Sequence, residues 1–97
     1  MRLAIIIPAY NEEGTISGVI KKAKKYGTVI VVNDASKDRT ENVAKKSGAY
    51  VITHSKNKGL GGALRTGFQY AINKNFDAII TLDADGQHDP EDIPKFL

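Results

Sequence analysis

Four short runs of apolar, β-favouring residues alternate with three segments of helical periodicity along the chain. The apolar runs are residues 3–7, 28–32, 50–53 and 78–82, and each is typical of a strand. Between them, apolar residues recur three or four positions apart in residues 12–26, 38–47 and 63–73, which indicates amphipathic helices. This alternation with short connections predicts an α/β fold, with a Rossmann-like, mostly parallel sheet and helices on both faces.

Cap and turn residues indicate where these elements begin and end. Asn11 is expected to cap the first helix, and Gly27 to end it. The short strand 50–53 suits a sheet edge, and the polar, glycine-rich residues 54–62 are expected to form a loop with a tight turn. Residues 90–97 fit the beginning of a fourth helix, because Pro90 suits a first helical position.

Two carboxylates directly follow the fourth apolar run. Asp83 and Asp85 are two residues apart, so in an extended chain both side chains point to one side, roughly 6–7 Å apart. Such carboxylates repel each other unless a cation lies beside them, and Mg²⁺ or Mn²⁺ with a diphosphate suits oxygen ligands of this kind. The motif is weak by itself, because Asp-rich turns also cap loops and helices.

Polar residues follow the first and second strands as well, in residues 8–12 and 33–38. Ligands of parallel α/β sheets bind beyond the carboxyl ends of the strands, so the three polar segments predict one site at one edge of the sheet. A dinucleotide site would need Gly-x-Gly-x-x-Gly in residues 8–14, which lack it. The glycines of residues 59–67 are not followed by the Lys-Ser/Thr of a P-loop, so both of these nucleotide sites are disfavoured.

Composition and charge narrow the class of partner. The 97 residues suffice for one small domain, and 41% hydrophobic with 26% charged residues are ordinary globular values. The net charge of +3 permits a polyanionic partner, but much of it lies in a lysine-rich helix end, residues 21–25. The acidic residues cluster at the expected site and few aromatic residues are present for stacking, which disfavours nucleic acid.

The chain has no cysteine, which excludes a thiolate zinc site and fits a reducing compartment. It has no apolar run long enough to span a bilayer, and it begins with a strand-like segment instead of a signal peptide. We therefore expect a soluble, cytoplasmic chain.

Four segments together resemble family 2 glycosyltransferases of the GT-A fold, most closely the dolichyl-phosphate mannose synthase-like or polyprenyl-phosphate sugar transferase branch. The segments are residues 5–13, 31–40, 57–67 and 83–90, and the resemblance covers essentially the whole chain. It implies that residues 1–97 are the nucleotide-sugar-binding part, the N-terminal half of a GT-A domain. The implied reaction is metal-dependent sugar transfer from a GDP- or UDP-sugar, with Mg²⁺ or Mn²⁺ as cofactor. The implied acceptor is a polyprenyl or dolichyl phosphate at the cytoplasmic face of a membrane.

The resemblance also assigns residues to the nucleotide. Pro8, Tyr10 and Glu12 resemble family residues that line the base and ribose pocket. Asp34 resembles the carboxylate that accepts a hydrogen bond from a ring N–H of the base. Asn33 stands where the family commonly has an acid, so we place less weight on it than on Asp34.

Further residues correspond to the metal and the sugar phosphate. Asp83 resembles the first aspartate of the family motif, facing the ribose and metal, and Ala84 follows it beside the nucleotide. Asp85 resembles the metal ligand and Gln87 an additional ligand. Arg65 is similar to a basic residue near the nucleotide or sugar phosphate, so Asp85 and Arg65 are the expected catalytic residues.

The two histidines are not expected to bind a metal. His54 and His88 have no partner histidine at metal-binding spacing, so we expect loop or cap roles for both.

Family members continue well beyond this length, so we expect the chain to bind nucleotide weakly and not to turn over alone. The alternative function is a non-catalytic nucleotide-binding α/β module. An exposed edge on the fourth strand would favour a homodimer.

Overall fold

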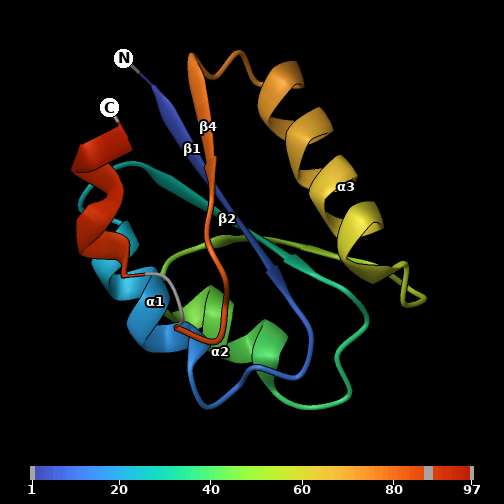
Figure 1. Ribbon diagram of the computed structural model, residues 1–97. Helices are drawn as coiled ribbons and strands as arrows, with labels where there is room; N and C mark the ends of the chain where they lie inside the picture. The colour runs from blue at the N-terminus through green and yellow to red at the C-terminus, as the bar shows by residue number, and fades with distance from the viewer. Residues whose placement is uncertain (1, 87–88, 97) are drawn as a thin grey trace.

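The structure is a computed structural model that describes residues 2–86 and 89–96. Four parallel strands form one sheet in the order β3-β2-β1-β4, with helices on both faces (Figure 1). The strands are β1 (Leu3–Ala9), β2 (Thr28–Asn33), β3 (Tyr50–Thr53) and β4 (Ala78–Thr81). The helices are α1 (Ile16–Ala23), α2 (Thr40–Lys46), α3 (Gly59–Asn73) and the 3₁₀ helix η1 (Pro90–Phe96). The predicted α/β fold is confirmed, as is the edge position of the third strand.

Strand β1 is the centre of the sheet. It pairs with β2 from Ala4↔Thr28 to Ala9↔Asn33 and with β4 from Leu3↔Ala78 to Ile6↔Thr81. Its backbone is therefore hydrogen-bonded along both edges, and its side chains are covered on both faces. This two-sided burial explains why the first apolar run is continuous instead of alternating.

Successive side chains of the central strands enter two separate cores. The core under α1, α2 and η1 contains Ile5, Ile7, Val29, Val31, Ile16, Ile20, Ala44 and Ile93. The core under α3 contains Ala4, Ile6, Ile30, Val32, Ala63 and Ala71. The second core uses small helical residues, so α3 lies close to the strands.

Several element boundaries differ from the sequence-based prediction, and α1 ends at Ala23 instead of continuing to Gly27. Asn11 is not a helix cap: its φ is 54°, a left-handed turn, and α1 begins only at Ile16. Residues 59–62 are not a loop but the first turn of α3, which a carboxylate from another part of the chain caps. The last segment is a 3₁₀ helix with Pro94 inside it, where the missing proline N–H disfavours a regular α-helix.

The two edge strands of the sheet are β3 and β4. The apolar residues of β4 are only half-buried, and the homodimer expected through this edge stays a prediction.

In the described part of the chain, no helix combines the length and the apolar character needed to cross a bilayer.

The close approach of α3 to β1 gives the first testable prediction. A Cβ atom at Gly67 would lie 2.4 Å from Ile6 Cγ2. We expect Gly67→Ala to lower the free energy of unfolding by about 1–3 kcal/mol through overpacking, as measured by urea denaturation. The control is Gly61→Ala in the same helix, where a Cβ would meet nothing within 4 Å. That change should stabilise the protein by about 0.5–1 kcal/mol, and equal effects of the two would contradict this packing.

Candidate functional site

The carboxyl ends of the four strands lie at one edge of the sheet, because all strand pairs are parallel. The segments that leave this edge are residues 10–15 after β1, 34–39 after β2, 54–58 after β3 and 82–86 after β4. Hydrogen bonds connect these segments to one another, as the following paragraphs describe. The predicted convergence of polar segments at one edge is confirmed.

Reciprocal hydrogen bonds join the segments after β1 and β2. Asn11 and Glu13 of the first segment each donate a backbone N–H to a side chain of the second segment. The side chain of each also accepts a backbone N–H from the second segment. The bonds, donor first, are Asn11 N to Ser36 Oγ (2.9 Å), Lys37 N to Asn11 Oδ1 (2.8 Å), Glu13 N to Asp38 Oδ2 (3.2 Å) and Arg39 N to Glu13 Oε2 (3.4 Å). The left-handed turn at Asn11 serves this connection, which is why Asn11 does not cap α1.

Glu12 and Thr15 connect the beginning of α1 to two other segments. The Glu12 N–H donates to Thr40 Oγ1 at 2.8 Å. The Thr15 hydroxyl lies 2.8 Å from the Ala84 carbonyl oxygen and 3.1 Å from Glu12 Oε2, so it can donate to either acceptor. The segment after β4 is thereby attached to α1.

Asp34 is 4% exposed and is the centre of a buried hydrogen-bond network. Its Oδ1 accepts from His54 Nδ1 and from the Lys58 N–H, and its Oδ2 accepts from the Gly59 N–H, each at 2.8 Å. Because these two N–H groups are at the start of α3, Asp34 caps a helix remote from it in sequence. Burial by itself raises the pKa of Asp34, but the hydrogen bonds from His54, Lys58 and Gly59 outweigh it and hold that pKa below its ordinary value.

A pocket of about 260 Å³ opens beside this carboxylate, and we call it the Asp34 pocket. Its lining residues come from the ends of β1 and β2, from the segment after β3 and from the beginning of α3: Pro8, Ala9, Tyr10, Asp34, Asn57, Gly59, Leu60 and Ala63. An acceptor oxygen flanked by an aromatic ring and aliphatic side chains suits a flat heterocycle that carries an N–H. Three of the residues assigned to the nucleotide, Pro8, Tyr10 and Asp34, are therefore together.

The aspartates after β4 are arranged differently from the prediction. Pairing continues to Leu82, whose N–H donates to the Ile6 carbonyl, so Asp83 follows at the level of the end of β1. The strand itself ends at Thr81, and residues 84–86 form a turn. The extended arrangement expected for Asp83 and Asp85 is therefore wrong. Asp83 is half-buried, Ala84 is buried and Asp85 is exposed.

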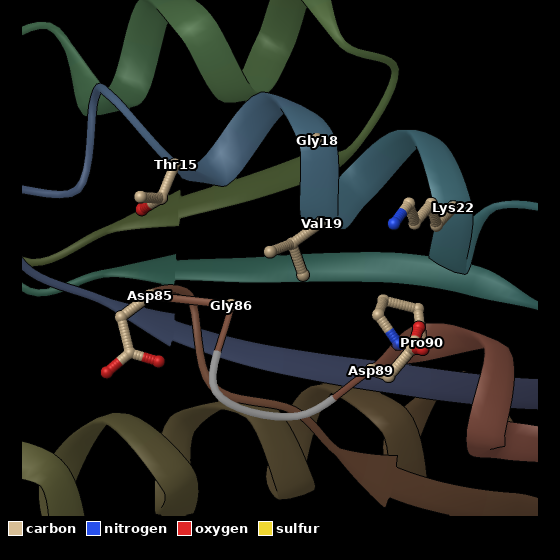
Figure 2. Close-up of a pocket in the computed structure, with 8 residues that line it drawn as sticks. All are labelled: Thr15, Gly18, Val19, Lys22, Asp85, Gly86, Asp89 and Pro90. Carbon is tan, nitrogen blue, oxygen red and sulfur yellow. The ribbon is translucent and has the colours of Figure 1, made fainter.

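Asp85 also borders a wider pocket of about 420 Å³, which we call the α1 pocket. Figure 2 shows its two walls. One face of α1 and its N-cap supply Thr15, Gly18, Val19 and Lys22, and the chain after β4 supplies Asp85, Gly86, Asp89 and Pro90. The turn at Asp85 thus lies between α1 and the end of β4, at the same edge of the sheet as the Asp34 pocket.

The donor set after β4 is compatible with a hard divalent cation. Asp83 and Asp85 offer carboxylate oxygens, the ligands that Mg²⁺ and Mn²⁺ prefer. Among residues 2–86 and 89–96, no three His, Cys, Asp or Glu side chains gather closely enough to hold an ion alone. A magnesium site of one or two carboxylates, completed by substrate phosphates and water, fits this set. Gln87, the expected additional ligand, lies outside the described residues.

Arg65 is not brought to either pocket. It lies on the exposed side of α3 and is absent from the residues that line the Asp34 pocket and the α1 pocket. Glu12 likewise lines neither of them. The roles assigned to these two residues stay predictions.

His54 lies in the loop after β3, as the sequence predicts, but its burial was not predicted. Its side chain is 7% exposed, with both ring nitrogens hydrogen-bonded to protein. The signal was present in the sequence, because His54 directly follows a strand, as do the polar segments that defined the site. His88 lies outside the described residues.

Comparison with known proteins identifies the family. Residues 4–97 match the family model described as glycosyl transferase family 2. The chain belongs to this family. The resemblance found in the sequence is thereby confirmed, and so is the GT-A type of fold.

Two relatives and one solved structure illustrate this family 2 membership. The UDP-N-acetylglucosamine–dolichyl-phosphate N-acetylglucosaminyltransferase of Methanococcus voltae is 38% identical over 112 residues, covering 96% of this chain and 45% of that protein. The undecaprenyl-phosphate mannosyltransferase of Micrococcus luteus is 35% identical over 105 residues, covering 100% and 43%. Glucosyl-3-phosphoglycerate synthase of Mycobacterium tuberculosis, in complex with Mn²⁺, UDP and glucosyl-3-phosphoglycerate, superposes with a TM-score of 0.71 at 27% identity, covering 86% and 33%. The chain spans less than half the length of these proteins.

The Asp34 network predicts a pH dependence of stability. Because the pKa of Asp34 is lower in the folded than in the unfolded protein, its contribution is present above the unfolded pKa and is lost as pH falls through the folded pKa. We expect Asp34→Asn to cost about 1–3 kcal/mol of unfolding free energy at pH 7. The difference between the two proteins should shrink as the pH is lowered below about 4, the ordinary carboxyl range.

The measurement is chemical denaturation of both proteins from pH 7 to pH 2.5 or so. Asp38, Glu41 and Glu91 also have lowered pKa values, but they are present in both proteins, so the difference isolates Asp34. A difference that stays constant across this range would contradict the assigned network.

Proposed function

We propose that this chain forms the donor-binding part of a glycosyltransferase that transfers a sugar from a nucleoside diphosphate sugar to a polyprenyl or dolichyl phosphate. The observation that carries the proposal is the family match over residues 4–97 together with the Asp34 pocket at the strand ends. Two relatives are named for dolichyl- or undecaprenyl-phosphate, and one structural neighbour was crystallised with Mn²⁺ and UDP. These names support the acceptor, the nucleotide and the metal of the proposal.

In this proposal the base enters the Asp34 pocket. Asp34 accepts a hydrogen bond from a ring N–H, which both uracil and guanine carry, and Tyr10 supplies an aromatic surface for the base. Pro8 and Glu12 complete the base and ribose contacts. The pocket walls are formed by Tyr10, 43% exposed, and Leu60, 65% exposed, so the apolar surface that the base would cover is accessible.

The diphosphate lies toward the turn after β4. Asp83 and Ala84 face the ribose, and Asp85 with Gln87 holds Mg²⁺ or Mn²⁺. The cation, when bound, supplies Lewis-acid stabilisation of the leaving diphosphate. Arg65 contributes positive charge near the sugar phosphate. A lipid phosphate acceptor already carries an anionic oxygen, so it needs little deprotonation and the reaction places small demands on a general base.

The lipid acceptor sets where such a protein acts. A polyprenyl or dolichyl phosphate resides in a bilayer, so we propose that the transfer takes place at the cytoplasmic face of a membrane. The donor-binding surface at the carboxyl edge of the sheet would face this acceptor.

The donor site is tested by calorimetric titration with UDP and with GDP, each with and without Mn²⁺. We expect tighter binding of one nucleotide when Mn²⁺ is present. Asp85→Asn should reduce this metal-dependent gain by at least about tenfold, since even changes outside the ligand shell cost that much in metal affinity. The matched control is Asp92→Asn, an exposed acid of η1 paired with Lys95, which should leave the gain unchanged. Equal behaviour of the two variants would refute the assignment of Asp85.

A further inference from the structure

His54 and Thr66 extend the Asp34 network into the middle of α3. Because an ionised carboxylate only accepts hydrogen bonds, the His54 Nδ1 that lies 2.8 Å from Asp34 Oδ1 carries a proton. Nε2 of the same ring lies 2.8 Å from Thr66 Oγ1, and that hydroxyl lies 3.1 Å from the Gly62 carbonyl oxygen. The result is a chain of hydrogen bonds, buried at Asp34 and His54 and partly buried at Thr66, that runs from the end of β2, through the residue after β3, to α3.

The donors around Asp34 are divided unequally between its two oxygens. Oδ1 accepts two hydrogen bonds, from His54 and Lys58, whereas Oδ2 accepts one, from Gly59. Of these three partners only Gly59 lines the Asp34 pocket. Since each carboxylate oxygen can accept about two hydrogen bonds, the greater acceptor capacity is left on Oδ2, the oxygen bonded to Gly59.

We propose that His54 and Thr66 are positioning residues for base selection: they hold Asp34 as an acceptor with Oδ2 toward the pocket, so that the site selects bases with a ring N–H. Uracil N3 and guanine N1 carry that hydrogen, whereas cytosine N3 and adenine N1 present a lone pair. This inference rests on the proposed function and adds to it the residues that determine which class of nucleotide is accepted.

The position of His54 gives it this role. Burial disfavours the ionised form of Asp34, and a protonated carboxyl would itself be a donor that suits cytosine or adenine. The hydrogen bond from His54 is the side-chain contribution that, with two backbone N–H groups, holds the pKa of Asp34 below its ordinary value. The backbone donors belong to the first turn of α3 and persist in any side-chain variant. Removal of the His54 donor should therefore weaken the acceptor while α3 keeps its cap.

The test compares nucleotides that differ at the ring nitrogen, UDP against CDP and GDP against ADP, by calorimetry at pH 7 with Mn²⁺. For at least one pair we expect the wild-type protein to prefer the N–H base by about tenfold or more, the difference expected for one hydrogen bond to a charged group. His54→Leu removes the donor and should bring this ratio close to one. Thr66→Val is isosteric, removes the partner of Nε2 and should lower the ratio several-fold.

Two conservative variants separate positioning from simple packing. His54→Asn retains an N–H donor near the position of Nδ1 and should keep most of the preference for the N–H base. Thr66→Ser retains the hydroxyl and should show the full wild-type preference. Unfolding is measured in parallel. If His54→Leu is not folded at the titration temperature, the ratio in Thr66→Val decides.

The outcomes distinguish this inference from the proposed function. If the wild-type protein binds none of the four nucleotides, the proposed function is wrong and the inference is overturned with it. If the wild-type protein binds nucleotides without discrimination, or if folded Thr66→Val and His54→Leu keep the wild-type ratio, His54 only supports the cap of α3. In those cases the proposed function stands and the inference alone is overturned.

Discussion

The site depends on the burial of β1 between two parallel neighbours. β1 is hydrogen-bonded to β2 and β4 and covered by helices on both faces, so it cannot shift relative to either neighbour without exposing apolar side chains. All four strands run the same way, so their carboxyl ends lie at one edge. Polar residues far apart in sequence, such as Tyr10, Asp34 and Asp83, are thereby brought to this edge, which carries the candidate site.

Asp34 links the stability of the fold to the candidate site. Its carboxylate caps α3, accepts from His54 and lines the pocket proposed for the base. A buried charge is costly unless it is hydrogen-bonded, and here three donors offset that cost. The same donors fix the orientation of the carboxylate, so the group that caps α3 also presents a fixed acceptor to the pocket proposed for the base.

Helix α3 takes its N-terminal hydrogen bonds from another segment. In the described chain, the N-cap residues of α1, α2 and α3 form no side-chain cap hydrogen bonds of their own. At α2 the local Asp38, two residues away, accepts from the Thr40 N–H, whereas at α3 the acceptor is the remote Asp34. Such bonds between segments hold the loops in one arrangement, which reduces the conformational entropy that a ligand would have to remove on binding.

The sequence by itself determined the strands, the helices and the edge of the sheet that carries the site. Hydrophobic periodicity encodes burial directly, and parallel connections follow from the alternation of elements. It could not determine that Asn11 joins two loops, that residues 59–62 are helical, or that Asp85 lies in a turn directly after Asp83. It also did not show that His54 is buried against Asp34. Those features depend on hydrogen bonds between residues some 20 or more positions apart, and only the tertiary structure decides which donor meets which acceptor.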